Sequence, residues 1–440
     1  MKNNRIPIKK YRFLALILML VGCVHAQSLL TLEDAVKIAL ENNYAIRMAR
    51  NDAQVSQTNV AIGNAGMFPK VTASFTDSNG IQHLSQTRAD GTVNSVDNAK
   101  SSNISYGANL DWTVFDGFKM FARYDQLKAL QQLGESQMKL KILDRIGAVN
   151  TMYFDLVQQQ LQLSALDTAL VISKQRLTLA QNRYSIGKAS KLEVLNAQVD
   201  LNADTSALLK QKELFTQTKT QLNQLLARDI TTDFKVSEEI QVDPKLDLAE
   251  LTALAQKQNP QLESLLISKK VAELQLKQTK ANRYPTVKVN TGYNFSEAKS
   301  ELGFTTQSSA RGLNYGLSAT LNLFDGNSQN RNEKIAKLTV ENSKLALEEQ
   351  QQALQTQLAL AYQTYQTQLQ LSELEEKNVQ IAQQNLNITL DKFRIGTITT
   401  FEFRTAQLNF VEAKTRYSNT LYQAKLAEIG LRELAGNLTF

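Results

Sequence analysis

The sequence has few of the residues on which most catalytic and metal centres depend. Its 440 residues include two histidines and one cysteine. Zinc sites are built mainly from histidine and cysteine, and thiol or histidine catalysis needs the same side chains. The sequence also lacks a GxSxG element, a phosphate-binding loop and an HExxH element. We therefore predict no metal, no cofactor and no enzymatic activity.

Proline is also scarce, and its absence excludes another class of protein. There are five prolines, whereas 42% of the residues are hydrophobic and 21% are charged. Disordered and loop-rich chains contain more proline and fewer hydrophobic residues. The mean hydropathy of −0.30 is too low for a protein made mainly of membrane-spanning helices. These values predict a folded chain.

Basic residues are concentrated at the N-terminus. Five of them precede the first acidic residue, Glu33, so removal of residues 1–26 lowers the net charge from +7 to +2. This small remainder gives no indication of nucleic-acid binding. An apolar run (FLALILMLVG, 13–22) too short to span a bilayer is followed by a cleavage-like Val24-His25-Ala26. We predict that residues 1–26 are a signal peptide. Alternatively, LVGC at 20–23 resembles a bacterial lipobox, which makes Cys23 a candidate lipidation site.

The chain contains two similar halves. Residues 29–48 resemble residues 245–264 at an offset of 216, and beyond the Phe-Asp-Gly elements the offset is 209. Self-similarity of this kind indicates repeated structure. The predicted organisation is a first structural repeat over 27–228, an inter-repeat linker over 229–247 and a second structural repeat over 248–440.

Each half shows the same order of predicted elements. Apolar residues at three- and four-residue steps predict helices over 31–66 and 248–283, which Pro69 and Pro285 should end. Strict alternation of apolar and polar residues then predicts β-hairpins over about 70–115 and 286–324, with strands of about ten residues. In the first hairpin, residues 78–102 are predicted to be a polar loop that contains His83.

Very long helices follow each hairpin. The segments 118–183 and 327–395 contain no proline, and second long helices are predicted over 188–227 and 397–435. A helix of 66 residues would be about 100 Å long. A heptad repeat of apolar residues in the second helix of each half predicts lateral packing like that of a coiled coil. Its positions are Val194, Leu201, Leu208, Phe215 and Leu222, with Phe403, Phe410, Tyr417, Ala424 and Leu431 as duplicates.

The strands raise the question of what covers their apolar face. A half-buried sheet in a soluble domain is one answer, but the long helices already use their apolar stripes on one another. The strands instead suit membrane-spanning β-strands. Four strands cannot close a barrel, and an open edge in lipid would leave backbone groups unpaired. The sequence therefore predicts assembly with further copies of the chain.

The whole pattern resembles the TolC family of outer membrane efflux proteins over about residues 29–436. The resemblance is carried by the duplicated plan, by Phe-Asp-Gly after each hairpin, and by the turn sequences YSIGKASKLEVLNAQ (184–198) and FRIGTITTFEFRTAQ (393–407). It implies a mainly α fold with a small β part. In such a fold, three copies would form a twelve-stranded transmembrane β-barrel that is continuous with a trimeric α-barrel.

The resemblance also implies a function and partners. The chain would be a homotrimeric exit duct in the outer membrane of a Gram-negative bacterium, in contact with outer membrane lipid and extending into the periplasm. A periplasmic adapter would join it to an inner-membrane pump of the RND, ABC or MFS class, in multidrug efflux or type I secretion. An adapter-type coiled-coil coupling protein and an exported enzyme with a helical stalk are the alternatives. The duplicated strands argue against the first, and the missing catalytic residues argue against the second.

Candidate site residues follow from the same resemblance. The two glycine-containing turns would lie at the periplasmic tip, where the adapter docks and the channel opens. This predicted docking site comprises Ser185, Ile186, Gly187, Lys188, Arg394, Ile395, Gly396 and Thr397. Asp391, whose duplicate is Asn182, is a candidate pore or gate residue, because threefold symmetry would make it a ring of three carboxylates. A solvated charge near a helix end is the alternative.

Overall fold

A computed structural model describes residues 29–301 and 305–437, so the predicted signal peptide and Cys23 lie outside the described residues. The chain forms two compact units, and each takes segments from both sequence repeats. Of the described residues, unit 1 contains 29–48, 140–259 and 353–437, and unit 2 contains 49–139, 260–301 and 305–352. No helix in the described part is both long and apolar enough to cross a bilayer.

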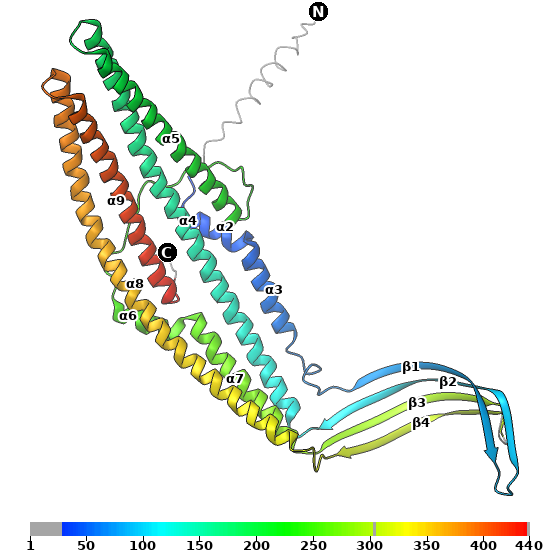
Figure 1. Cartoon of the computed structure of the whole chain (residues 1–440). Helices are drawn as coiled ribbons and strands as arrows, with labels where there is room; N and C mark the ends of the chain where they lie inside the picture. The colour runs from blue at the N-terminus through cyan, green and yellow to red at the C-terminus, as the bar shows by residue number, and fades with distance from the viewer. Residues whose placement is uncertain (1–28, 302–304, 438–440) are drawn as a thin grey trace, which may run out of the picture. The chain divides into compact units, whose positions relative to one another are not determined.

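Two long helices run through both units. They are α4 (Lys119–Ser185) and α8 (Ser328–Ile395), and each is followed by a shorter partner in unit 1, α5 (Lys191–Leu225) or α9 (Thr400–Leu434). Within unit 1 the α4–α5 hairpin lies beside the α8–α9 hairpin (Figure 1). Heptad residues such as Leu208, Leu222, Phe403 and Phe410 are buried. The mainly helical class with a small β part is confirmed.

The prediction of unbroken helices over 31–66 and 248–283 is wrong. The first is divided into α2 (Leu32–Asn42) and α3 (Tyr44–Thr58), and the second into α6 (Leu248–Gln258) and α7 (Pro260–Ala281). Asn43 Oδ1 accepts hydrogen bonds from the Ala45 and Ile46 N–H groups, which starts a new helix at that point. At the second break the proline after Asn259 disfavours helical backbone before it. The first repeat also leaves the helix at Thr58, well before Pro69.

Paired side-chain contacts in unit 1 reflect the duplication. Asn43 Nδ2 donates to the Leu225 carbonyl at 2.7 Å, and Asn259 Nδ2 donates to the Leu434 carbonyl at 2.8 Å. These amides fix the end of α2 or α6 to the end of the last helix of the same repeat. In the same way, the Tyr153 hydroxyl donates to the Leu30 carbonyl and the Tyr362 hydroxyl to the Leu246 carbonyl. The two halves therefore use equivalent residues to hold equivalent backbone segments.

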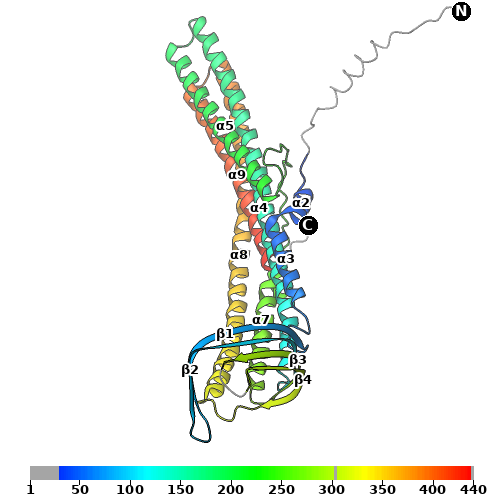
Figure 2. The same ribbon diagram turned by 90° about the vertical axis from the view of Figure 1, so that its right-hand side faces the viewer.

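Unit 2 contains one antiparallel sheet with the strand order β1-β2-β3-β4 (Figure 2). The strands are β1 (Lys70–Thr87), β2 (Val93–Phe115), β3 (Thr286–Ser300) and β4 (Gln307–Thr320). The prediction of a loop over 78–102 is wrong, because β1 and β2 remain paired through most of it. His83 lies in β1 and contacts Asp97 of β2. All four strands are longer than the predicted ten residues.

The two faces of the sheet differ in chemistry. Large apolar side chains on one face are open to the surroundings, among them Phe75 at 71%, Tyr315 at 82% and Leu317 at 72% exposure. The other face carries serine, threonine, asparagine and glycine at the alternate positions. After each hairpin an aspartate of the Phe-Asp-Gly element caps the next helix: Asp116 accepts from the Met120 N–H and Asp325 from the Gln329 N–H.

Candidate functional site

The two glycine-containing turns have the same backbone geometry. Gly187 has φ +73° and Gly396 has φ +84°, values that side chains with a Cβ rarely adopt. The Lys188 N–H donates to the Arg183 carbonyl at 2.8 Å, and the Thr397 N–H donates to the Lys392 carbonyl at 3.0 Å. These six-to-one hydrogen bonds, with the glycine in the left-handed region, make each turn a Schellman motif. The glycines are therefore required by the backbone itself.

The helices that leave the turns also begin with matching caps. The Ser190 side chain accepts from the Glu193 N–H at the start of α5. At the start of α9, Thr399 and Glu402 form a capping box, in which each side chain bonds the other residue's N–H. The turns are thus fixed on both sides, and their conformation is set locally.

The predicted docking residues present a mixed surface at these turns. Ile186 and Ile395 are 65% and 75% exposed, although both are apolar. Such exposure of large aliphatic side chains is typical of a contact surface. The Ser185 hydroxyl is turned back to the Asn182 carbonyl. Lys188, Arg394 and Thr397 are exposed.

The structure brings the two turns together within unit 1. The Arg183 guanidinium from the end of α4 lies 6.0 Å from the Phe393 ring centroid at the end of α8. The same guanidinium is 3.7 Å from the position that a Cβ on Gly396 would occupy, and it pairs with Glu193. Phe393 is buried and stacks on Phe403, with ring centroids 5.0 Å apart. The turns therefore share one side-chain cluster.

Asp391 lies outside this cluster. Its carboxylate is exposed and pairs with Arg394 at 3.4 Å, a contact between residues three apart on the same helix. Contacts of this kind at a surface contribute little to stability.

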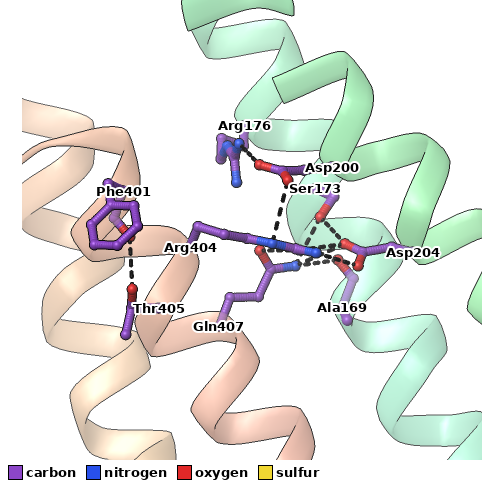
Figure 3. Close-up of polar contacts among 9 residues, drawn as sticks. All are labelled: Ala169, Ser173, Arg176, Asp200, Asp204, Phe401, Arg404, Thr405 and Gln407. Carbon is purple, nitrogen blue, oxygen red and sulfur yellow. Dashed lines mark hydrogen bonds and ion pairs between the residues drawn. The ribbon is translucent and has the colours of Figure 1, made fainter. Parts of the chain in front are cut away.

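A buried polar network lies further along the same helices (Figure 3). Arg404 of α9 donates to both carboxylate oxygens of Asp204 in α5, at 2.7 and 2.8 Å. Asp204 also accepts from the Ser173 hydroxyl of α4 at 2.5 Å. Gln407 of α9 donates to Ser173 and to the Ala169 carbonyl. The network thus joins the α4–α5 hairpin to α9, within unit 1.

A second ion pair extends the network. Arg176 of α4 bonds Asp200 of α5, and Asp200 lies 3.7 Å from Arg404 Nε. Two arginines and two aspartates therefore balance in charge. Burial alone disfavours a charged guanidinium, but the hydrogen bond and charge of Asp204 and the charge of Asp200 outweigh it and raise the pKa of Arg404. Bidentate arginine–carboxylate pairs of this geometry are among the strongest charge-assisted hydrogen bonds.

The network is incompletely satisfied at Arg176. This side chain is almost wholly buried, yet its Nε and Nη1 atoms have no hydrogen-bond partner among the described residues. Buried donors without partners are destabilising, by about 1–3 kcal/mol each. The network therefore holds the hairpins together less tightly than a fully paired one would.

Sequence reasoning did not identify this network. A signal was present, because none of its four charged residues has a charged residue at the equivalent position of the other half. With the offset of 209, the counterparts of Arg176, Asp200 and Asp204 are Asn385, Asn409 and Ala413, and the counterpart of Arg404 is Leu195. Charges that interrupt an otherwise duplicated helical pattern are candidates for contacts between the halves.

Metal ligands do not gather anywhere in residues 29–301 and 305–437: no three His, Cys, Asp or Glu side chains lie close enough to hold an ion.

Comparison with known proteins places the chain in a family. Residues 35–228 and 251–437 match the family described as outer membrane efflux protein. The protease secretion protein PrtF of Dickeya chrysanthemi is 19% identical over 95% of this chain and 90% of its own length. The alkaline protease secretion protein AprF of Pseudomonas aeruginosa is 22% identical over 93% of this chain and 85% of its own.

A solved structure shows the same fold. The CmeC outer membrane channel of Campylobacter jejuni superposes with a TM-score of 0.77 at 17% identity, over 92% of this chain and 85% of that one. The family is one of channels and is not an enzyme family. Because the family match covers both repeats, the chain belongs to the outer membrane efflux protein family, the TolC family, and is an efflux channel of the Gram-negative outer membrane.

Proposed function

We propose that three copies of this chain form one exit duct, with twelve strands closing a single β-barrel. The observation that carries this proposal is the open four-stranded sheet of unit 2, whose outer strands β1 and β4 each pair with one neighbour among the described residues. Its exposed apolar face suits lipid, whereas an unpaired strand edge does not, since each unpaired backbone group in a membrane costs several kcal/mol. Pairing β4 of one copy with β1 of the next removes both edges.

The helices support the same assembly. On α5, Leu192, Leu195 and Val199 are exposed at three- and four-residue steps. On α8, Leu374, Ile381 and Ile388 are exposed at seven-residue steps. Stripes with heptad spacing pack against other helices, and these side chains remain more than half exposed in the described chain. Neighbouring copies would cover them in a trimeric α-barrel.

The partners are a periplasmic adapter and, through it, an inner-membrane pump of the RND, ABC or MFS class. We assign the adapter contact to residues 185–188 and 394–397, with Ile186 and Ile395 as the apolar contacts. The similarity to two protease secretion proteins favours export of polypeptides, whereas the likeness to CmeC supports only the fold. The duct itself is passive.

Opening is a separation of the helical hairpins near the turns. The bonds that such a movement must break are those of the buried network and the contacts of Arg183. The unpaired N–H groups of Arg176 reduce the free energy that this step requires. Asp391 is the proposed source of a carboxylate ring near the gate.

The docking assignment is tested by replacing Gly187 and Gly396 with valine. At a positive φ a β-branched side chain is strained, so the double variant should distort both turns and abolish efflux in a strain that lacks its own channel. Trimers extracted from the outer membrane by detergent should persist. The matched control is Gly91→Val, which has φ +83° in the β1–β2 turn and open space around it. Normal efflux by the double variant would contradict the assignment.

A further inference from the structure

The polar face of the sheet carries an ordered pattern of glycine and asparagine. In the β2–β3 register, Gly107 faces Asn294 and Asn109 faces Gly292. In the β3–β4 register, Asn294 faces Gly312 and Gly292 faces Asn314. The two residue types therefore alternate both along each strand and from strand to strand. We call this pattern the Gly–Asn lattice.

The asparagine side chains lie flat on the lattice. Asn294 Nδ2 donates to Asn109 Oδ1 at 3.0 Å. A Cβ on Gly107 would lie 2.1 Å from Asn294 Oδ1, and a Cβ on Gly292 would lie 2.1 Å from Asn109 Oδ1. Each amide thus occupies the space above a glycine of the neighbouring strand. A Cβ at Gly107 or Gly292 would displace the amide, and it would also lie 2.6 or 2.9 Å from the Tyr293 or Ala108 carbonyl of the neighbouring strand.

The same face is almost free of charge. Lys70, Asp111 and Lys288 lie at the helix-proximal end of the sheet. Beyond them, the positions of this face over 72–82, 101–109, 290–300 and 308–320 hold only serine, threonine, asparagine, glutamine, glycine and alanine. By contrast, the opposite face carries Arg311 and Lys299 beyond its aromatic side chains.

We infer that the Gly–Asn lattice makes the strand-lined part of the duct a smooth bore that does not select its cargo by charge. This rests on the proposed trimer, in which the polar face lines the lumen. Rings of like charge in a pore attract one sign of ion and repel the other. Flat amides offer hydrogen-bond donors and acceptors without either effect. The lattice glycines set the width of the bore, and the asparagines set its neutrality.

The test measures the local potential with an introduced thiol, so it does not depend on whether the far end of the duct is open. Ser105→Cys places a thiol on the polar face of β2, opposite Ser296. Two thiosulfonate reagents of similar size and opposite charge are applied to detergent-purified trimers at about 10 mM salt, where the screening length is about 30 Å. The unmodified chain serves as the blank for Cys23.

Neutrality predicts that the cation-to-anion rate ratio at the introduced thiol stays within about twofold of the ratio for a small uncharged thiol. Adding Asn294→Asp, which keeps the side-chain shape, should raise the ratio at least about fivefold. Adding Ser309→Asp, on the opposite face, should leave it unchanged. An unequal ratio in the variant with Ser105→Cys alone, or no response to Asn294→Asp, would overturn the inference.

The bore is tested with glycine substitutions in the Ser105→Cys background. Gly107→Ala should slow the reaction of the introduced thiol with a bulky polymer-linked maleimide at least about threefold, because the displaced amide narrows the lumen. The reaction rates of the small thiosulfonate reagents should not change. Gly312→Ala is the matched control, since its Cβ would have nothing within 4 Å. Equal rates would overturn the role of the glycines. If Gly107→Ala forms no trimers, the Asn294→Asp result still decides the neutrality.

A separate variant tests the proposed trimer, so that its failure can be told apart from failure of the lattice inference. Leu110→Cys places a thiol on the apolar face, where detergent or lipid should shield it. If the thiols introduced at positions 105 and 110 react alike, or if no detergent-dependent trimer forms, then the assembly is wrong and the lattice has no lumen to line.

Discussion

The two halves of this chain agree where the backbone must be held and differ where charge is buried. Asn43 and Asn259 anchor equivalent helix ends, and Gly187 and Gly396 form equivalent turns. The buried network, however, takes three charged side chains from the first half and one from the second. None of the four is charged at its counterpart position. Duplication has preserved the fold, and the departures from it create contacts between the halves.

This difference separates contacts that stabilise the fold from contacts that could change when the duct opens. A contact present in both halves supports each hairpin in the same way and has no reason to favour one state of the duct. A contact that crosses between hairpins is made or broken when they move. Most of the predictions below exchange a residue for its counterpart in the other half, and one pair of variants removes the same contact from both halves.

The largest effect is expected from Asp204→Ala, which installs the residue type of its counterpart, Ala413. Removing this carboxylate leaves Arg404 with the neutral Gln407 Oε1 at 3.2 Å and with Asp200 at 3.7 Å, in a site where its side chain is 14% exposed. Loss of one partner of a buried ion pair costs about 3 kcal/mol. Unfolding of detergent-solubilised protein, followed by circular dichroism of the helices, measures this loss.

The double variant Asp204→Ala with Arg404→Leu makes both positions match the other half. Because the unpaired charge is then gone, it should be more stable than Asp204→Ala alone. The double variant should also open more readily, seen as a larger single-channel conductance. Strictly additive losses of stability would show that the two residues do not interact.

A smaller and symmetric effect is expected at the asparagine anchors. Asn43→Ala and Asn259→Ala each remove a donor to the last helix of the same repeat, at 2.7 and 2.8 Å. Both side chains are buried, so each loss should cost about 2 kcal/mol. The two variants should agree within about 0.5 kcal/mol in the same unfolding measurement. A clear inequality would mean that the halves are less equivalent than their contacts suggest.

The sequence was informative wherever a repeating physical pattern exists. Alternation located the strands and heptads supported the second long helix of each half, because burial of one face leaves a period in the chain. The first long helix of each half was predicted from the absence of proline. The break at Asn43 was missed because a single capping amide leaves no period, and the break at Asn259 was missed although Pro260 follows it. The strands were extended through 78–102 by pairing between polar residues, for which alternation gives no signal.

The backbone turns of the candidate site could be predicted from the sequence, whereas the side-chain contacts between the hairpins could not. Gly187 and Gly396 were found because a left-handed turn favours glycine. The Asp204–Arg404 pair joins residues 200 positions apart, and only the packing of the hairpins brings them together. The assignments to an adapter and to Asp391 stay predictions.

A pH-dependent difference between the halves is expected at Glu433, whose counterpart is Gln224. Burial, together with the charge of Asp144, raises the pKa of Glu433 above its ordinary value near 4.5. The folded state therefore favours the protonated form, and stability falls as the pH rises from 4.5 through the raised pKa. Glu433→Gln should remove this fall and make the protein more stable than the parent at about pH 7.

The measurement compares midpoints of unfolding for parent and variant from about pH 4 to pH 8. The difference between the two midpoints should grow with pH, because only the parent has the carboxyl group of Glu433 to ionise. Other titrating carboxylates, such as Asp155, contribute equally to both proteins. A constant difference would mean that Glu433 has the same pKa in the folded and unfolded chains.

The smallest effect on stability is expected at Asp391, the acidic counterpart of Asn182. Its exposed pair with Arg394 at 3.4 Å contributes at most about 0.5 kcal/mol, so Asp391→Asn should leave unfolding nearly unchanged. Its effect should appear in conduction, because three carboxylates in a ring attract cations and three amides do not. Reversal potentials in planar bilayers under a salt gradient should therefore show a weaker cation preference in the variant. Glu348→Gln, an exposed acid elsewhere on α8, is the control. Unchanged selectivity would leave Asp391 as a solvated charge near the helix end and direct attention to the buried network as the element that distinguishes the two halves in function.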